Sequence, residues 1–366
     1  MQLVVSFSQI ILYIALAILF GTFILTLIPE KLRPSFFVSK KWVIGAAISI
    51  PIATFIPVLY IIIYIAPRLG VIRAIEVVLT QYTTGIAWSI GFLLSSVLIF
   101  LILYANQMNK QHSKGYVYIS LFLLTSIVIT IGWASHASAI NVGLGIISDS
   151  LHLLAASIWV GILFVVTWFN TNTKNWLAFL KWFTLVAISC LAIITISGFL
   201  LLDVLVDDYI NAWMISYGQG LFLKHLFIVP MLFYAAINGI FVKFMLTKNE
   251  QYNPLRGAKV ESLILLVIFI ITAIFSQSSP PHGFYLTSDA ISPLFTWLHH
   301  TPIMADSYVA FISNPVAIIF IFLSMLMIGA NIAAYFLKAP VWTLCITSLL
   351  LVASLYTTFM LSVGVQ

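Results

Sequence analysis

The histidines of this chain are the residues whose type and position best suit chemistry. Seven are present among 366 residues, and six of them stand at the ends of apolar segments, or in loops, on one side of the expected membrane topology. Three of the six, His136, His152 and His225, are expected at similar depth. An ionisable group at that depth usually faces a bundle interior or a cavity, and imidazole is a common ligand for transition metals. We therefore predict a transition-metal site there, and copper suits an imidazole-rich one.

Two of these histidines stand in neighbouring motifs. Ser135-His136-Ala137 precedes a short loop, and Asp149 precedes His152 by three residues. Residues spaced by three lie on one face of a helix, so the Asp149 carboxylate is placed to orient a metal-bound imidazole through its second ring N–H. The alternative is that Asp149 caps the start of the helix by accepting from its first amides. The two roles are compatible, and both stay open.

A second group follows the sequence Tyr217-Gly-Gln-Gly220, where Lys224 and His225 enter an apolar segment together. His225 is either a metal ligand or the donor to a neighbouring backbone carbonyl. Lys224 supports the predicted site, or it extends its ammonium to the membrane surface, as long basic side chains do. Asn238, deeper in the same segment, is expected to hydrogen bond to a neighbouring helix.

The longest segment between apolar spans, the outer loop 277–314, supplies further candidates. It contains His282 after two prolines, the adjacent pair His299 and His300, and then Met304. Neighbouring residues point to different sides of a helix, so at most one of the pair joins a given site; we take His300 together with His282. The thioether of Met304 suits Cu(I). Part of this loop is expected to form a helix that lies on the membrane surface.

The composition shows what elements must position these side chains. Hydrophobic residues make up 62% of the chain and charged residues 7%, whereas soluble domains are about half apolar and about a quarter charged. A soluble enzyme, a secreted disulfide scaffold and a disordered protein are therefore excluded. A helix needs about 20 apolar residues to cross a bilayer, so we expect an all-α polytopic membrane bundle forming a single membrane domain over residues 1–366. The ten expected spans are 4–28, 43–65, 83–106, 116–135, 149–170, 177–202, 221–243, 260–276, 315–337 and 341–363.

The charges between the spans set the expected orientation. Sorted by loop, 13 of the 16 Lys and Arg residues fall on one side, and 7 of the 10 Asp and Glu residues fall on the other. Basic loops face the cytoplasm, so both termini are expected outside it. The net charge of +6 is then a topology signal, and no nucleic-acid partner is expected. The acidic residues on the basic side are Glu30, Glu250 and Glu261.

Several other features narrow the function. We expect no enzyme, because no nucleophile–base pair and no phosphate-binding glycine loop stands in a suitable context. Cys190 and Cys345 lie in separate apolar runs and predict no disulfide framework. The N-terminal segment lacks the basic start and small-residue cleavage site of a signal peptide, so it is expected to be the first transmembrane helix.

Taken together, the motifs resemble the copper resistance protein D (CopD/PcoD) family, including the membrane part of YcnJ-like copper proteins. The resemblance covers roughly residues 130–285, and residues 177–276 correspond to the characteristic helical region of the family. The matching motifs are Ser135-His136-Ala137, Asp149, His152 to Gly161, Ser197-Gly198, Tyr217 to Gly220, Lys224-His225, Asn238-Gly239 and Ser279-Pro-Pro-His282.

The resemblance implies a multi-pass protein of the bacterial cytoplasmic membrane that takes up copper, as Cu(I) or Cu(II), from the extracytoplasmic face. Family relatives often carry, or are encoded beside, a soluble CopC-like domain, and no segment of this chain fits one. Either a separate extracytoplasmic CopC-like copper carrier delivers the metal, or copper handling here differs from that of the family. The other expected partners are copper ion and the lipid bilayer. The candidate metal ligands are His136, His152, His225, His282 and His300, and the candidate supporting residues are Asp149, Lys224 and Met304.

The residues alone also allow a different class of protein. Paired histidines on membrane helices hold b-type haem through both axial positions, and helical bundles host such cofactors. His152 with His225, or His136 with His300, would serve as such a pair. The alternative is therefore a bis-His haem protein that transfers electrons within the membrane.

Overall fold

The computed structural model describes residues 2–249, 252–283, 286–304 and 306–366. Within these ranges, ten helical segments are long and apolar enough to cross a membrane, and each overlaps one of the ten expected spans. The remaining elements are short helices and one two-stranded antiparallel sheet. The prediction of an all-α polytopic membrane protein is therefore confirmed. Both cysteines are free thiols.

Contacts between residues divide the chain into two compact units, residues 1–205 and 206–366, and each is described by itself. The expectation of one membrane domain stays a prediction. Unit 1 contains α1 (Gln2–Leu27), η1 (Glu30–Leu32), α2 (Lys40–Leu69), α3 (Val71–Gln81), α4 (Thr83–Gln107), α5 (Lys114–Trp133), α6 (His136–Ile140), α7 (Val142–Trp168) and α8 (Trp176–Leu205). Unit 2 contains η2 (Asn211–Met214), α9 (Ser216–Ala236), η3 (Ile237–Val242), α10 (Lys243–Lys248), α11 (Leu255–Phe275), α12 (Pro293–His299), β1 (Val309–Phe311), α13 (Pro315–Phe336), α14 (Val341–Leu361) and β2 (Val363–Val365).

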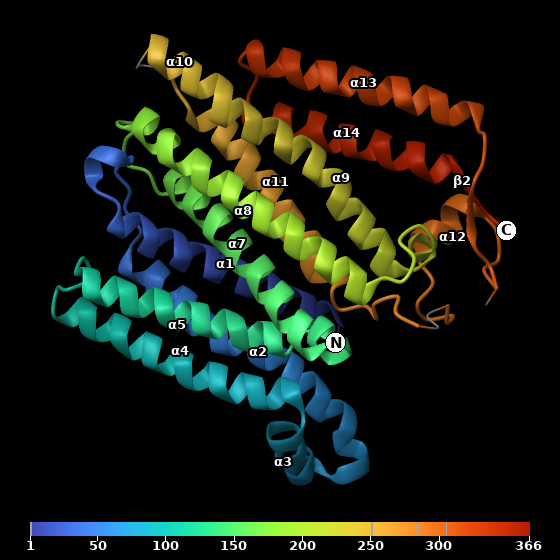
Figure 1. Cartoon of the computed structure of the whole chain (residues 1–366), viewed down its shortest axis with the longest axis horizontal. Coiled ribbons are helices and arrows are strands. Elements are labelled where there is room, and N and C mark those ends of the chain that lie inside the picture. Colours follow the sequence, from blue (N-terminus) through green and yellow to red (C-terminus); the bar gives the residue numbers. More distant parts are fainter. Residues whose placement is uncertain (1, 250–251, 284–285, 305) are drawn as a thin grey trace. The chain divides into compact units, whose positions relative to one another are not determined.

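Unit 1 is built around α1, which packs against α2, α5 and α7. Small residues allow a close approach of α1 and α7, because a Cβ on Gly161 would stand 2.2 Å from the carbonyl oxygen of Ala17. Such packing is typical of membrane helices, where apolar side chains gain little by leaving lipid. In the same unit α4 and α5 lie side by side, and α8 packs on α7 (Figure 1).

Two basic loops of unit 1 meet at one end of its helices. The loop between α1 and α2 is joined to the loop between α7 and α8 by two backbone hydrogen bonds. Phe37 N–H donates to Phe169 O at 2.8 Å, and Thr171 N–H donates to Ser35 O at 2.8 Å. The expected topology requires these two loops on the same side, and their pairing agrees with it.

In unit 2, α13 and α14 form a helical hairpin (Figure 1), and α14 packs against α9 and α11. The segments between the spans gather at the end where α9 begins. Ser216 N–H donates to Ala290 O at 2.9 Å, and Asp207 N–H donates to Pro281 O at 3.2 Å. We call this end of unit 2 the histidine end, and the end that carries the α10–α11 loop its basic end. Glu250, in that loop, lies outside the described residues.

Helix α12 forms inside the outer loop, where the sequence predicts a surface helix. Ser292 caps its start by accepting from Phe295 N–H at 3.4 Å. It ends at His300, whose φ of 52° is left-handed. The helix is therefore confirmed, and its position on a membrane surface stays a prediction.

Candidate metal site

His152 lies half-buried on α7 of unit 1 and is held by α8. Its Nδ1 lies 3.2 Å from Ser197 Oγ. The Ser197 hydroxyl already donates its proton to the carbonyl of Ile193 at 2.6 Å, and a hydroxyl has one proton to give. Nδ1–H of His152 therefore donates to the Ser197 oxygen, and this contact orients the ring.

The start of α7 corrects one alternative for Asp149. Asn141 is the N-cap, and its Oδ1 accepts from Leu144 N–H at 3.1 Å. Asp149 lies two turns inside the helix, so the capping role is wrong. The shared helix confirms that Asp149 and His152 are three residues apart on one helix face. His136 is the first residue of α6 and is exposed.

His225 lies half-buried on α9 of unit 2 and is held by a tyrosine. Its Nδ1 lies 2.7 Å from Tyr209 Oη, in the segment before η2. Burial raises the pKa of Tyr209 to about 12, so its hydroxyl stays neutral near pH 7. The tyrosine side chain takes the place of the backbone carbonyl that the sequence offered as the alternative partner. The neighbouring Lys224 places its Nζ 6.0 Å from the ring centroid of Phe275, a cation–π distance.

His282 in the outer loop is held by a carboxylate. Its Nδ1 lies 3.1 Å from Asp207 Oδ1, and the two side chains are 47% and 48% exposed. Asp207 Oδ2 also accepts from Gly283 N–H at 2.7 Å. An ionised carboxylate only accepts, so Nδ1–H of His282 is the donor. Such exposed pairs add little stability, but they orient the ring.

The remaining candidates of the outer loop lie in different surroundings. The ring of His299 packs on Phe295, with centroids 4.1 Å apart, and burial lowers the pKa of His299. His300 is exposed, and Met304 is 62% exposed. The adjacent histidines thus separate, as their spacing predicts.

No group of three or more His, Cys, Asp or Glu side chains placed to hold a metal comes together among the residues that the structure describes. The joint binding of copper by His136, His152 and His225 stays a prediction. Sequence reasoning did not assign Ser197, Tyr209 and Asp207 as the residues that hold the rings. The signals present in the sequence were the Ser197-Gly198 motif and the polar triplet Asp207-Asp208-Tyr209 between two apolar spans.

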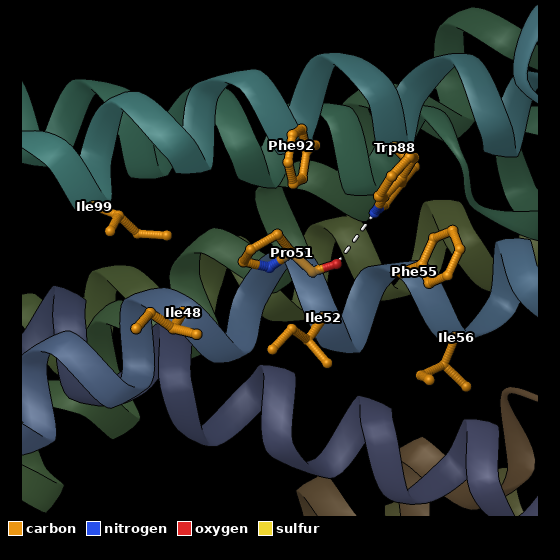
Figure 2. Close-up of a pocket in the computed structure, with 8 residues that line it drawn as sticks. All are labelled: Ile48, Pro51, Ile52, Phe55, Ile56, Trp88, Phe92 and Ile99. Carbon is orange, nitrogen blue, oxygen red and sulfur yellow. Dashed lines mark hydrogen bonds between the residues drawn. The ribbon is translucent and has the colours of Figure 1, made fainter.

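A hollow in unit 1 provides no metal ligands. It has a volume of about 370 Å³ and lies on α2 and α4 (Figure 2). Its one polar contact is the hydrogen bond from Trp88 Nε1 to the carbonyl of Pro51 at 3.1 Å. With this lining it suits a hydrocarbon chain. The lining residues are Ile48, Pro51, Ile52, Phe55, Ile56, Trp88, Phe92 and Ile99.

Comparison with known proteins points to copper. The model of the family described as copper resistance protein D matches residues 177–275. A second model, described as copper resistance protein D-like, N-terminal domain, matches residues 1–147. The copper transport protein CutJ of Bacillus subtilis (strain 168) is 28% identical over 206 residues, which cover 54% of this chain and 37% of that protein. The match therefore spans well under two thirds of that relative. No solved structure matches the chain.

Proposed function

Because this chain belongs to the copper resistance protein D family, we propose that it binds copper at its histidines and carries it inward across the bacterial cytoplasmic membrane. The ten long apolar helices among the described residues support a multi-pass membrane protein. The name of its relative, the copper transport protein CutJ, supports movement of the ion rather than a covalent reaction on a substrate.

One structural observation carries the proposal. His152, His225 and His282 are each held at Nδ1 by an oxygen of another segment. Holding one ring nitrogen orients the other, and this is how proteins usually prepare a histidine for a metal. His136 and His300, exposed at helix ends, are the additional ligands we propose. Asp149, Lys224 and Met304 support the site by charge or by a soft sulfur atom.

The direction follows from charge. The loops that carry most Lys and Arg residues face the cytoplasm by the positive-inside rule. The histidines lie toward the opposite ends of the spans, so copper enters from the extracytoplasmic side. The outer loop with His282 and His300 is the surface on which an extracytoplasmic CopC-like carrier would deliver the ion.

Copper binding by the purified full chain tests the site. Cu(I) and Cu(II) are offered separately against a competing chelator to the wild type and to His152→Ala, His225→Ala and His282→Ala. We expect each variant to weaken copper binding about 10-fold or more. His112→Ala is the control, because His112 is exposed in a loop that carries Lys110 and Lys114. Wild-type affinity in all three variants would overturn the proposed site.

Two further measurements complete the test. Copper accumulation in proteoliposomes distinguishes a transporter from a protein that only binds the ion. The absorption spectrum of the same preparation addresses the haem alternative, for which the comparisons give no support. A Soret band that disappears in His152→Ala or His225→Ala would replace copper with haem at these residues.

A further inference from the structure

A buried polar pair lies away from the histidine end of unit 2. Asn238 Nδ2 donates to Oε2 of Glu261 on α11 at 2.6 Å. The two residues are only 7% and 3% exposed. Glu261 stands inside one of the apolar helices that are long enough to cross a membrane. An ionisable residue is costly at such a place and is a functional candidate with its partner.

The backbone around Asn238 is irregular. The span from Ser216 to Lys248 is α-helical on either side, but Ile237–Val242 is π-helical. Single π-helical turns are rare and are frequently found at functional sites. Asn238 is the second residue of this turn, so the irregular backbone and the buried amide coincide.

The amide oxygen of Asn238 is a second sign that the pair binds something. It is buried, and no donor reaches it among the described residues. On α11, a Cβ at Gly257 would stand 2.3 Å from this oxygen, so only glycine leaves room for the amide. A buried acceptor without a donor is unfavourable. Beside a carboxylate, it suits a proton-bearing group or a small cation.

The pair is near the basic end of unit 2 and far from His225. A Cβ at Gly257 would also lie 3.5 Å from Tyr335 Cε2, and Tyr335 Oη lies 3.2 Å from Tyr252 Oη in the loop before α11. The Tyr335 ring thus lies beside Gly257, and its hydroxyl contacts the basic loop. His225 stands thirteen residues before Asn238 in the same span, which is about 20 Å along a helix.

We infer that the Asn238–Glu261 pair is a protonation site that exchanges its proton for the passing cation. The neutral acid releases its proton to water at the basic end when Cu⁺ arrives, and the resulting carboxylate balances the charge of the ion. When Cu⁺ leaves, the carboxylate takes a proton back from the same side. One proton therefore replaces one monovalent cation, and no net proton crosses the membrane. The identity of the cation in this cycle rests on the proposed copper transport. Protonation of Glu261 does not depend on that proposal.

Infrared difference spectroscopy of the purified full chain, between acid and alkaline pH, tests protonation directly. We expect a protonated-carboxyl band that is lost in Glu261→Gln, whose side chain keeps the size and the acceptor oxygen. Asn238→Ala shifts the band because it removes the donor, and this keeps the test available if Glu261→Gln does not fold. Asn331→Ala is the control, since Asn331 is another buried amide of unit 2, bonded to Tyr234. A spectrum that is the same in wild type and Glu261→Gln, or unshifted in Asn238→Ala, would overturn the inference.

Copper flux in oriented proteoliposomes tests the exchange. We expect wild-type flux to change several-fold with the pH on the basic side, and Glu261→Gln to lose that dependence while its histidines still bind copper. Added Cu(I) should also bleach the carboxyl band of the wild type. If the flux does not change with this pH and the carboxyl band does not change on adding Cu(I), the exchange is overturned and the transport proposal stays intact. A band that titrates in a chain that moves no copper overturns the transport proposal and leaves the protonation site.

Discussion

Two pairs of unit 2, each joining a side-chain nitrogen to a carboxyl group, differ in their exposure to water. His282 and Asp207 are 3.1 Å apart, and each side chain is nearly half exposed. Asn238 and Glu261 are 2.6 Å apart and almost fully buried. Water screens the exposed pair, so it contributes little stability, whereas a buried polar group depends on its partner. The exposed pair can thus orient a ring, and the buried pair can control a charge.

Removing one member of the buried pair should have the largest effect. Asn238→Leu deletes the amide that donates to Glu261, and we expect the free energy of unfolding to fall by about 3 kcal/mol. The double variant Asn238→Leu/Glu261→Leu should recover most of that loss, because two apolar groups need no hydrogen bond. Denaturant unfolding in detergent measures both. A double variant less stable than the single one would contradict the contrast between the two pairs.

Crowding the buried pair should have the next largest effect. Gly257→Ala places a Cβ 2.3 Å from Asn238 Oδ1, and we expect a loss of about 1–3 kcal/mol from overpacking. The matched control is Gly329→Ala on α13, where a Cβ would meet nothing within 4 Å. That control should be neutral, or more stable by up to about 1 kcal/mol, because alanine favours a helix. Equal melting temperatures for the two variants would show that the pair tolerates displacement.

At the histidine end, we expect substitutions to change copper affinity more than the free energy of unfolding. Tyr209→Phe removes the hydroxyl that lies 2.7 Å from His225 Nδ1. We expect copper affinity to fall about 10- to 100-fold, as when a metal-bound histidine loses its orienting partner. Tyr308→Phe is the control, since its hydroxyl donates to Gln366 Oε1. Chelator competition measures both, and equal affinities would remove Tyr209 from the site.

The exposed pair should give the smallest change. Asp207→Asn removes the charge beside His282, and we expect copper affinity to fall about 10-fold and unfolding free energy to change by less than about 1 kcal/mol. Asp289→Asn is the matched control for charge alone, because Asp289 is an exposed acid in the outer loop that contains His282. If Asp207→Asn destabilised the chain as much as Asn238→Leu, exposure would not explain the difference between the pairs.

The sequence predicted the spans better than it predicted their starts. All ten spans appear, but α7 begins at Val142 and not near Asp149. Glycines at 143 and 145 have a low helix propensity, so the sequence does not indicate that α7 begins before them. The structure shows a reason for one of them, because a Cβ at Gly145 would stand 2.3 Å from the backbone of Ala137. The capping role of Asp149 failed for this reason.

The hydrogen-bond partners of the polar side chains were also harder to predict from the sequence than the spans. The expected helix–helix hydrogen bond of Asn238 is confirmed, but Glu261 is its partner across 23 residues of sequence. Ser197 stands 45 residues from His152, and Asp207 stands 75 residues from His282. Pairs so distant depend on how neighbouring helices rotate and slide against each other. Apolar periodicity in a membrane span carries little of that information.

Local hydropathy predicts a multi-pass helical membrane protein, because ten runs of the sequence are apolar enough to cross a bilayer. The motifs add a resemblance to a copper-related family. The packing of the helices shows which oxygen lies beside Nδ1 of His152, His225 and His282. It also shows that Glu261 is buried against an amide rather than exposed among the basic loops, because burial depends on what the other helices cover.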